Sequence, residues 1–281
     1  MILLVGAAGY TGRHVLPLLL EAGHRVRCLL RPSSDRCAVA GAEVVTADLE
    51  RPEQVEAAFD EEVRQVVNLA HIRFGPVLSR CAGPQVEHGV MLSSLRLFSQ
   101  VPDESVEVVR RAEASLLETA PGWTVLRPSM IYGPGDDRNL SRLAAYLRRR
   151  RFFPLFGGGT GLQQPVWVGD VARAVVAALG RREAVAGKSY ALAGPAALPY
   201  RQLVDTVGAA VGCRPFKVRL PVAPVVGLLR LAAACGVRPG IDPGQVRRLQ
   251  EDKVYDIGAA RRDLDFAPLD LAEGLRRSMD I

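Results

Sequence analysis

Hydrophobic positions in the first half of the chain follow two periods, one typical of buried strands and the other of amphipathic helices. Helical periodicity predicts helices at 12–22, 52–59, 75–82 and 103–119. Short apolar and β-branched runs between them predict strands at 1–5, 25–30, 43–46, 65–69, 88–93 and 123–126. This alternation favours the α/β class, with a doubly wound parallel sheet that carries helices on both faces.

Beyond Arg127 the regular alternation gives way to turns rich in proline and glycine, such as 133–135 and 157–159. The pattern there predicts shorter helices at 139–150, 170–180, 199–211, 221–235, 242–250 and 268–280. Because no low-complexity linker separates the two parts, we expect a first domain at 1–127 and a smaller lobe, mainly 128–281, interwoven with it. A ligand cleft is then expected at the carboxyl ends of the strands.

The turn after the first strand carries the strongest functional signal. Gly6, Gly9 and Gly12 are spaced three apart, follow an apolar strand and open an amphipathic helix. Backbone without Cβ lets a pyrophosphate approach closely, and the amides at a helix start favour negative charge. The turn, including Tyr10 and Thr11, therefore predicts a dinucleotide site, and the alternative is a merely tight strand-to-helix connection.

Residues after the next strands indicate which dinucleotide is bound. Arg31 stands where an acidic residue would accept the ribose 2′-hydroxyl of NAD, and Arg13 follows the third glycine. This favours NADP(H), with NAD(H) left open and an exposed arginine at a strand end as the structural alternative. Asp48 and Leu49 suit an adenine contact, although Asp48 is equally suited to cap the next helix. Ala70 is expected beside a cofactor ribose.

Composition and charge exclude several function classes. The chain has 281 residues, 48% of them hydrophobic, which is enough for a full core. The net charge of +6 comes with only three lysines, and the run 148–151 ends a predicted helix, so we expect no nucleic-acid partner. No uncharged apolar run is long enough to span a membrane, and the first core strand starts at Met1, so a cytoplasmic protein without a targeting segment is expected. Its five scattered cysteines predict free thiols and no metal site.

Several motifs in order resemble the short-chain dehydrogenase/reductase superfamily, in its extended and atypical branches, over essentially the whole chain. They are the glycine turn 6–12, Ser93-Ser94, the segment 126–135, the glycines 157–159, the segment 165–172 and the region 260–275. The resemblance implies a Rossmann-like domain with a smaller substrate lobe. It also implies that Pro128, Ser129 and Ile131 lie along the nicotinamide. Ser93 and Ser94 fill the place of the family's serine at the end of the fifth strand, and Ser93 is expected to contact the cofactor.

The catalytic pair of that superfamily is missing. Its members use a serine at the end of the fifth strand and a Tyr-x-x-x-Lys pair on the next helix, in which tyrosine donates a proton and lysine lowers the pKa of that tyrosine. Here the tyrosine position falls on or near Val106 and the lysine position on Arg110. Arg110 could still bind the ribose hydroxyls, but arginine cannot tune a proton donor as a desolvated lysine does.

Three functions remain open. The first is an NADP(H)-dependent reductase of a small molecule, in which Ser94, Tyr132 or His71 polarises the substrate; the alternatives are packing for Tyr132 and a core imidazole for His71. The second is a non-catalytic redox sensor or an accessory subunit with a protein partner, as monomer or homodimer. The third is a non-redox isomerase or cyclase, whose cleft would be lined by Phe74, Met130, Phe153 and Trp167. We favour the reductase.

Overall fold

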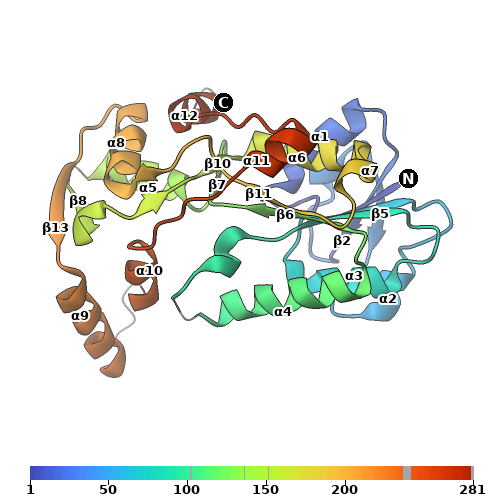
Figure 1. The fold of residues 1–281 in the computed structure, drawn as a ribbon, viewed down its shortest axis with the longest axis horizontal. Coiled ribbons are helices and arrows are strands. Elements are labelled where there is room, and N and C mark those ends of the chain that lie inside the picture. Colours follow the sequence, from blue (N-terminus) through green and yellow to red (C-terminus); the bar gives the residue numbers. More distant parts are fainter. Residues whose placement is uncertain (102, 136, 151, 237–241, 280–281) are drawn as a thin grey trace.

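The centre of the molecule is a seven-stranded parallel sheet with the strand order β11-β6-β5-β4-β1-β2-β3 (Figure 1). A computed structural model describes residues 1–101, 103–135, 137–150, 152–236 and 242–279. The strands are β1 (Ile2–Val5), β2 (Val26–Leu30), β3 (Glu43–Thr46), β4 (Gln65–Asn68), β5 (His88–Leu92), β6 (Thr124–Pro128) and β11 (Ser189–Leu192). The predicted α/β class and six predicted strands are confirmed, and β11 is a seventh strand that the sequence pattern did not reveal.

Helices cover both faces of the sheet, as Figure 1 shows. One face carries α1 (Gly12–Glu21), α6 (Val168–Gly180) and α11 (Gly258–Leu264), and the other carries α2 (Pro52–Glu56), α3 (Gly75–Cys81) and α4 (Glu104–Thr119). Strand alternation divides β1 between the two cores: Ile2 and Leu4 pack in the first, Leu3 and Val5 in the second. A strand buried on both faces explains why β1 is a continuous apolar run.

A smaller layer lies at one end of this sheet. Here β8 (Phe152–Phe156) pairs in parallel with β13 (Phe216–Leu220), and Tyr132 of β7 (Ile131–Tyr132) lies in a third core. The helices of this part are α5 (Leu140–Arg149), α8 (Tyr200–Ala210), α9 (Val222–Ala234), α10 (Pro243–Arg248) and α12 (Leu271–Met279). Further short elements are β9 (Leu162–Gln163), β10 (Val166–Trp167), β12 (Leu198–Pro199) and α7 (Arg182–Val185).

The second half of the chain also returns to the large sheet. Strand β11 pairs with β6, and α6 packs against α1, so residues well beyond Arg127 complete the first core. The segment that follows α10 runs back between the two parts before α11 packs near β11 and α6. Among the described helices, none has the length and apolar character needed to cross a membrane.

Candidate functional site

The glycine turn joins β1 to α1 in a shape that depends on the absence of side chains. Gly6 has φ +84°, and a Cβ there would lie 2.8 Å from the amide nitrogen of Ala70. A Cβ on Gly12 would lie 2.2 Å from the carbonyl oxygen of Gly6. Thr11 precedes α1 without a side-chain cap, and the first helical turn has no acidic residue. The turn therefore fits the phosphates of a dinucleotide, and Ala70 lies against it. Its predicted place beside a cofactor ribose stays a prediction.

The two predicted phosphate-binding arginines lie in or directly after the elements that flank this turn, since β2 pairs in parallel with β1. Arg31 directly follows β2, is exposed, and forms no side-chain hydrogen bond or ion pair within the described residues. Arg13 is exposed in the first turn of α1. Asp48 does not cap α2; one carboxylate oxygen accepts from the amide of Glu50 at 3.0 Å and so orders the loop after β3. Leu49 is buried beside it.

A cavity of about 1090 Å³ opens where β5 and β6 end. It brings together six residues predicted for cofactor binding or catalysis: Tyr10, Ser93, Ser94, Pro128, Ser129 and Ile131. The other side of the cavity is formed by residues that were not predicted from the sequence, among them Gln163, Gln164, Arg248, Glu251 and Lys253. The cavity therefore lies between the sheet and the C-terminal segment.

The two serines that end β5 have different surroundings. Ser93 donates its hydroxyl to Glu113 of α4 at 2.5 Å, and Glu113 also accepts from Nε of Arg127 at 2.7 Å. Only 4% of Glu113 is exposed. Ser94 accepts a hydrogen bond from the amide of Arg96 at 3.1 Å, which leaves its own hydroxyl proton free to donate into the cavity. Ser94 is therefore the better placed of the two to contact a substrate.

Helix α4 contains neither the tyrosine nor the lysine of the superfamily's catalytic pair. Val106 is buried in this helix, and Arg110 donates through Nε to the carbonyl of Leu97 at 2.7 Å and through Nη2 to that of Ser99 at 3.0 Å. The Arg110 guanidinium thus holds the short helical turn after β5 and is not among the residues lining the cavity. These two carbonyl contacts do not favour the predicted contact of Arg110 with a ribose, which stays a prediction.

Two predicted cleft residues lie elsewhere. Tyr132 is completely buried in the third core, and its hydroxyl lies 3.4 Å from the carbonyl oxygen of Asp270. Burial raises the pKa of this phenol well above its usual value, so it is a packing residue and the prediction of a cleft position was wrong. His71 is exposed and caps the turn Ile72–Phe74 by accepting from the amide of Arg73 at 3.2 Å, so it is neither a core imidazole nor a cavity residue.

Most of the apolar residues proposed to line the cleft of a non-redox enzyme lie outside the cavity. Of these four residues, Met130 alone lines the cavity among the described residues. Phe74 packs against the second core, whereas Phe153 and Trp167 pack against the third. Other apolar side chains, such as Phe98 and Leu249, line the cavity together with polar and charged ones, so its lining differs from the one expected for that alternative.

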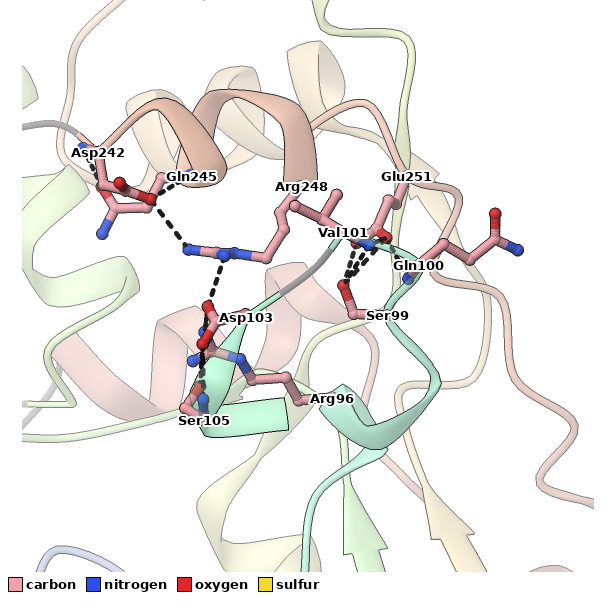
Figure 2. Close-up of polar contacts among 10 residues, drawn as sticks. All are labelled: Arg96, Ser99, Gln100, Val101, Asp103, Ser105, Asp242, Gln245, Arg248 and Glu251. Atoms are coloured by element: carbon pink, nitrogen blue, oxygen red, sulfur yellow. Dashed lines mark hydrogen bonds and ion pairs between the residues drawn. The ribbon is translucent and has the colours of Figure 1, made fainter. Parts of the chain in front are cut away.

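A network of polar contacts joins the two parts of the chain at the rim of the cavity (Figure 2). The Glu251 carboxylate accepts from the hydroxyl of Ser99 at 3.0 Å, from the amide of Gln100 at 2.7 Å and from that of Val101 at 3.1 Å. Arg248 donates to Asp103 at 2.6 Å. Hydrogen bonds from Ser105, together with nearby Arg96, lower the pKa of Asp103 to about 2. The two parts of the chain are thus joined at the rim by charged groups and hydrogen bonds.

Comparisons with known proteins agree with the fold and with the glycine turn. Residues 2–94 match the model of the NAD dependent epimerase/dehydratase family, and residues 106–222 match that of the 3-beta hydroxysteroid dehydrogenase/isomerase family. The Thermus thermophilus UDP-glucose 4-epimerase, solved in complex with NAD, has a TM-score of 0.73 at 21% identity, over 99% of this chain and 97% of that one. The molecule therefore has a nicotinamide-dinucleotide-binding fold.

Two curated relatives point to different roles. Subunit 9 of the mitochondrial NADH dehydrogenase (ubiquinone) 1 alpha subcomplex from Arabidopsis thaliana is 29% identical over 77% of this chain, which spans 59% of that relative. The 2-alkyl-3-oxoalkanoate reductase of Stenotrophomonas maltophilia is 24% identical over 98% of this chain and 97% of its own length.

Proposed function

This chain belongs to the extended branch of the short-chain dehydrogenase/reductase superfamily, and we propose that it is an NADP(H)-dependent reductase of a small carbonyl compound. The observation that carries the proposal is the single cavity in which Tyr10 of the glycine turn, Ser94 and Ser129 meet a second wall of polar residues. Such a cavity holds the reactive end of a dinucleotide and leaves room for a substrate. On this proposal, residues 1–127 hold most of the cofactor and the later residues form most of the substrate wall.

The preference for NADP(H) rests on Arg31. Its guanidinium is exposed directly after β2 and has no partner within the described residues, so it is free to pair with a 2′-phosphate. Calorimetry with NADPH and NADH tests this. We expect Arg31→Ala to weaken NADPH binding about tenfold or more, as for loss of a charge-assisted contact, and to leave NADH binding unchanged. Arg25→Ala is the matched control, because Arg25 precedes the other end of β2 and pairs with Glu62. Equal affinities for the two cofactors in the wild type would refute the preference.

Reduction is tested by following NADPH oxidation with a panel of ketones, enones and 3-oxoalkanoates. The last class is included because one relative is named as a 2-alkyl-3-oxoalkanoate reductase. We expect turnover with at least one carbonyl class and its loss when the cavity is narrowed by Ser94→Leu, with NADPH affinity retained. An inactive wild type that binds NADPH normally would contradict the reductase proposal.

A second candidate is a non-catalytic NADP(H)-binding subunit or sensor. It is favoured by the absence of a tyrosine and a lysine from α4, and by the relative that is named as a subunit of an NADH dehydrogenase. This candidate predicts NADPH binding without turnover, together with a partner protein whose binding responds to NADPH. Pull-down from a lysate with and without NADPH, using Arg31→Ala as the cofactor-binding control, distinguishes it from the reductase.

A further inference from the structure

The three lysines of the chain have different partners. Lys188 forms an ion pair with Asp263 at 2.9 Å, and Lys217 forms one with Asp205. Lys253 is bound instead to a neutral group, because its ammonium donates to the side-chain oxygen of Gln163 at 3.2 Å and no ion pair is found for it within the described residues. Lys253 also lines the cavity. It is therefore the lysine whose charge is available to a ligand.

The backbone around Lys253 is fixed against the wall of the cavity. Its amide donates to the carbonyl of Leu162 at 2.9 Å, and the amide of Leu162 donates to the Asp252 carboxylate at 2.9 Å. Two residues further on, the amide of Tyr255 donates to the side-chain oxygen of Gln164 at 2.8 Å. These bonds hold the segment on both sides of Lys253, so its side chain enters the cavity from a rigid support.

Gln163 provides a second, independent observation. Only 3% of this residue is exposed, and its side-chain nitrogen has no hydrogen-bond partner in the part of the chain that the structure describes. The orientation of the amide is fixed, because the ammonium of Lys253 can donate only to the oxygen of Gln163. Buried donors without a partner are rare in folded proteins. Gln163 and Lys253 line the same cavity, and a ligand oxygen bound between them would give this nitrogen the acceptor that it lacks.

We propose that the ammonium of Lys253 and the amide nitrogen of Gln163 form the binding site for the carbonyl oxygen of the substrate, and that Lys253 is the catalytic proton donor. The inference rests on the proposed function. When bound, reduced nicotinamide supplies a hydride to the carbonyl carbon. Lys253 supplies the proton: an N–H bond breaks, an O–H bond forms on the substrate oxygen, and the neutral amine recovers a proton from water. The chain thereby replaces the donor that α4 lacks.

The groups around Lys253 favour proton release. Burial lowers the pKa of its ammonium; the Glu251 carboxylate opposes this effect, and the Arg248 and Arg96 cations add to it. Lys253 is desolvated because it lies at the junction of the two parts of the molecule, and desolvation disfavours the charged ammonium. A lysine with a lowered pKa gives up its proton more readily than a surface lysine.

Binding can be tested without turnover by NMR after reductive methylation with ¹³C-formaldehyde. Only three lysine signals and that of the terminal amine are expected, and Lys253→Met assigns the signal of interest. With NADP⁺ bound, acetate supplies a simple oxygen acceptor. We expect acetate to shift the Lys253 signal but not those of Lys188 and Lys217, and Gln163→Leu to weaken this response. An unmoved Lys253 signal at about 100 mM acetate, well above a millimolar dissociation constant, would overturn the site.

Kinetics test the proton transfer. We expect Lys253→Met to lower kcat about 100-fold or more, as for loss of a general acid, with the dissociation constant of NADPH unchanged. Lys253→Arg should keep KM near the wild-type value and still lose kcat, because arginine does not release its proton. Lys217→Met removes the same charge elsewhere and should have no effect. Normal kcat in both Lys253 variants would overturn the role of Lys253 but not the proposed reductase function. Absence of NADPH binding in the wild type would overturn both.

Discussion

The buried contact between Glu113 and Arg127 links α4 to the end of β6 and should be a major contributor to stability. Glu113 accepts from Arg127 and from the hydroxyl of Ser93, and the side chain of Arg127 is 21% exposed. Replacing Glu113 with alanine removes the carboxylate and leaves a largely buried guanidinium without its charged partner. It also leaves the Ser93 hydroxyl without its acceptor.

The expected loss follows from these two consequences. Breaking a buried ion pair by removing one partner costs about 3–5 kcal/mol, because the remaining charge is desolvated and uncompensated. Since Arg127 keeps some contact with water, we expect the lower end of this range, about 3 kcal/mol, for Glu113→Ala. Removing both charges in Glu113→Ala/Arg127→Met should recover part of that loss, with a coupling free energy of about 1–3 kcal/mol.

Urea denaturation followed by circular dichroism gives the free energies of unfolding for the four proteins of this cycle. Glu107→Ala is the matched control on the same helix, because Glu107 is exposed and pairs with Arg111 one turn away. Its cost should stay within about 0.5 kcal/mol. A loss below about 1 kcal/mol for Glu113→Ala, or additive single effects, would show that the pair is not a buried, coupled unit.

Three further predictions concern single residues. Gly12→Ala should abolish NADPH binding, since its Cβ would meet backbone oxygen atoms, whereas Gly122→Ala, where no atom lies within 4 Å, should bind normally in calorimetry. Buried His88 has its pKa lowered from 6.5 to about 4, so its contribution to folding is complete above pH 6.5 and falls by about 3 kcal/mol towards pH 4. Urea titrations of the wild type and His88→Gln check this; parallel pH profiles would contradict it. Tyr132→Phe should retain wild-type kcat for any carbonyl reduced, because the hydroxyl is buried in the third core; a large loss of kcat would return Tyr132 to the list of catalytic residues.

Local sequence patterns predicted the sheet well, because each buried strand is a short apolar run followed by a recognisable turn. Strand β11 escaped prediction because it has only four residues and pairs with β6 from a distant part of the chain. In the site, the cavity positions of Ser94 and Ser129 could be predicted because both lie within two residues of the strand ends that place them. Tyr132 could not, since its orientation depends on the packing of β7 against the smaller lobe: Ile131 lines the cavity and its neighbour points into the core.

Residues of the opposite cavity wall depend on long-range pairing. Glu251 binds the segment 99–101 across about 150 positions of the sequence, and Lys253 meets Gln163 across 90. Periodicity within a window of a helix or strand carries no information about such partners. The unusual residue type was still visible, since Lys253 is one of only three lysines in a chain whose basic residues are mainly arginine.

The C-terminal segment connects the rim of the cavity to the position of Lys253. Glu251 binds the loop before α4, and Lys253, two residues later, is held against Leu162 on the other wall. Contacts on both walls of the cavity therefore position the segment that carries Lys253. On the function proposed here, contacts that a substrate makes with this rim also keep the proton donor in place, so binding energy gained far from the carbonyl can contribute to kcat as well as to affinity.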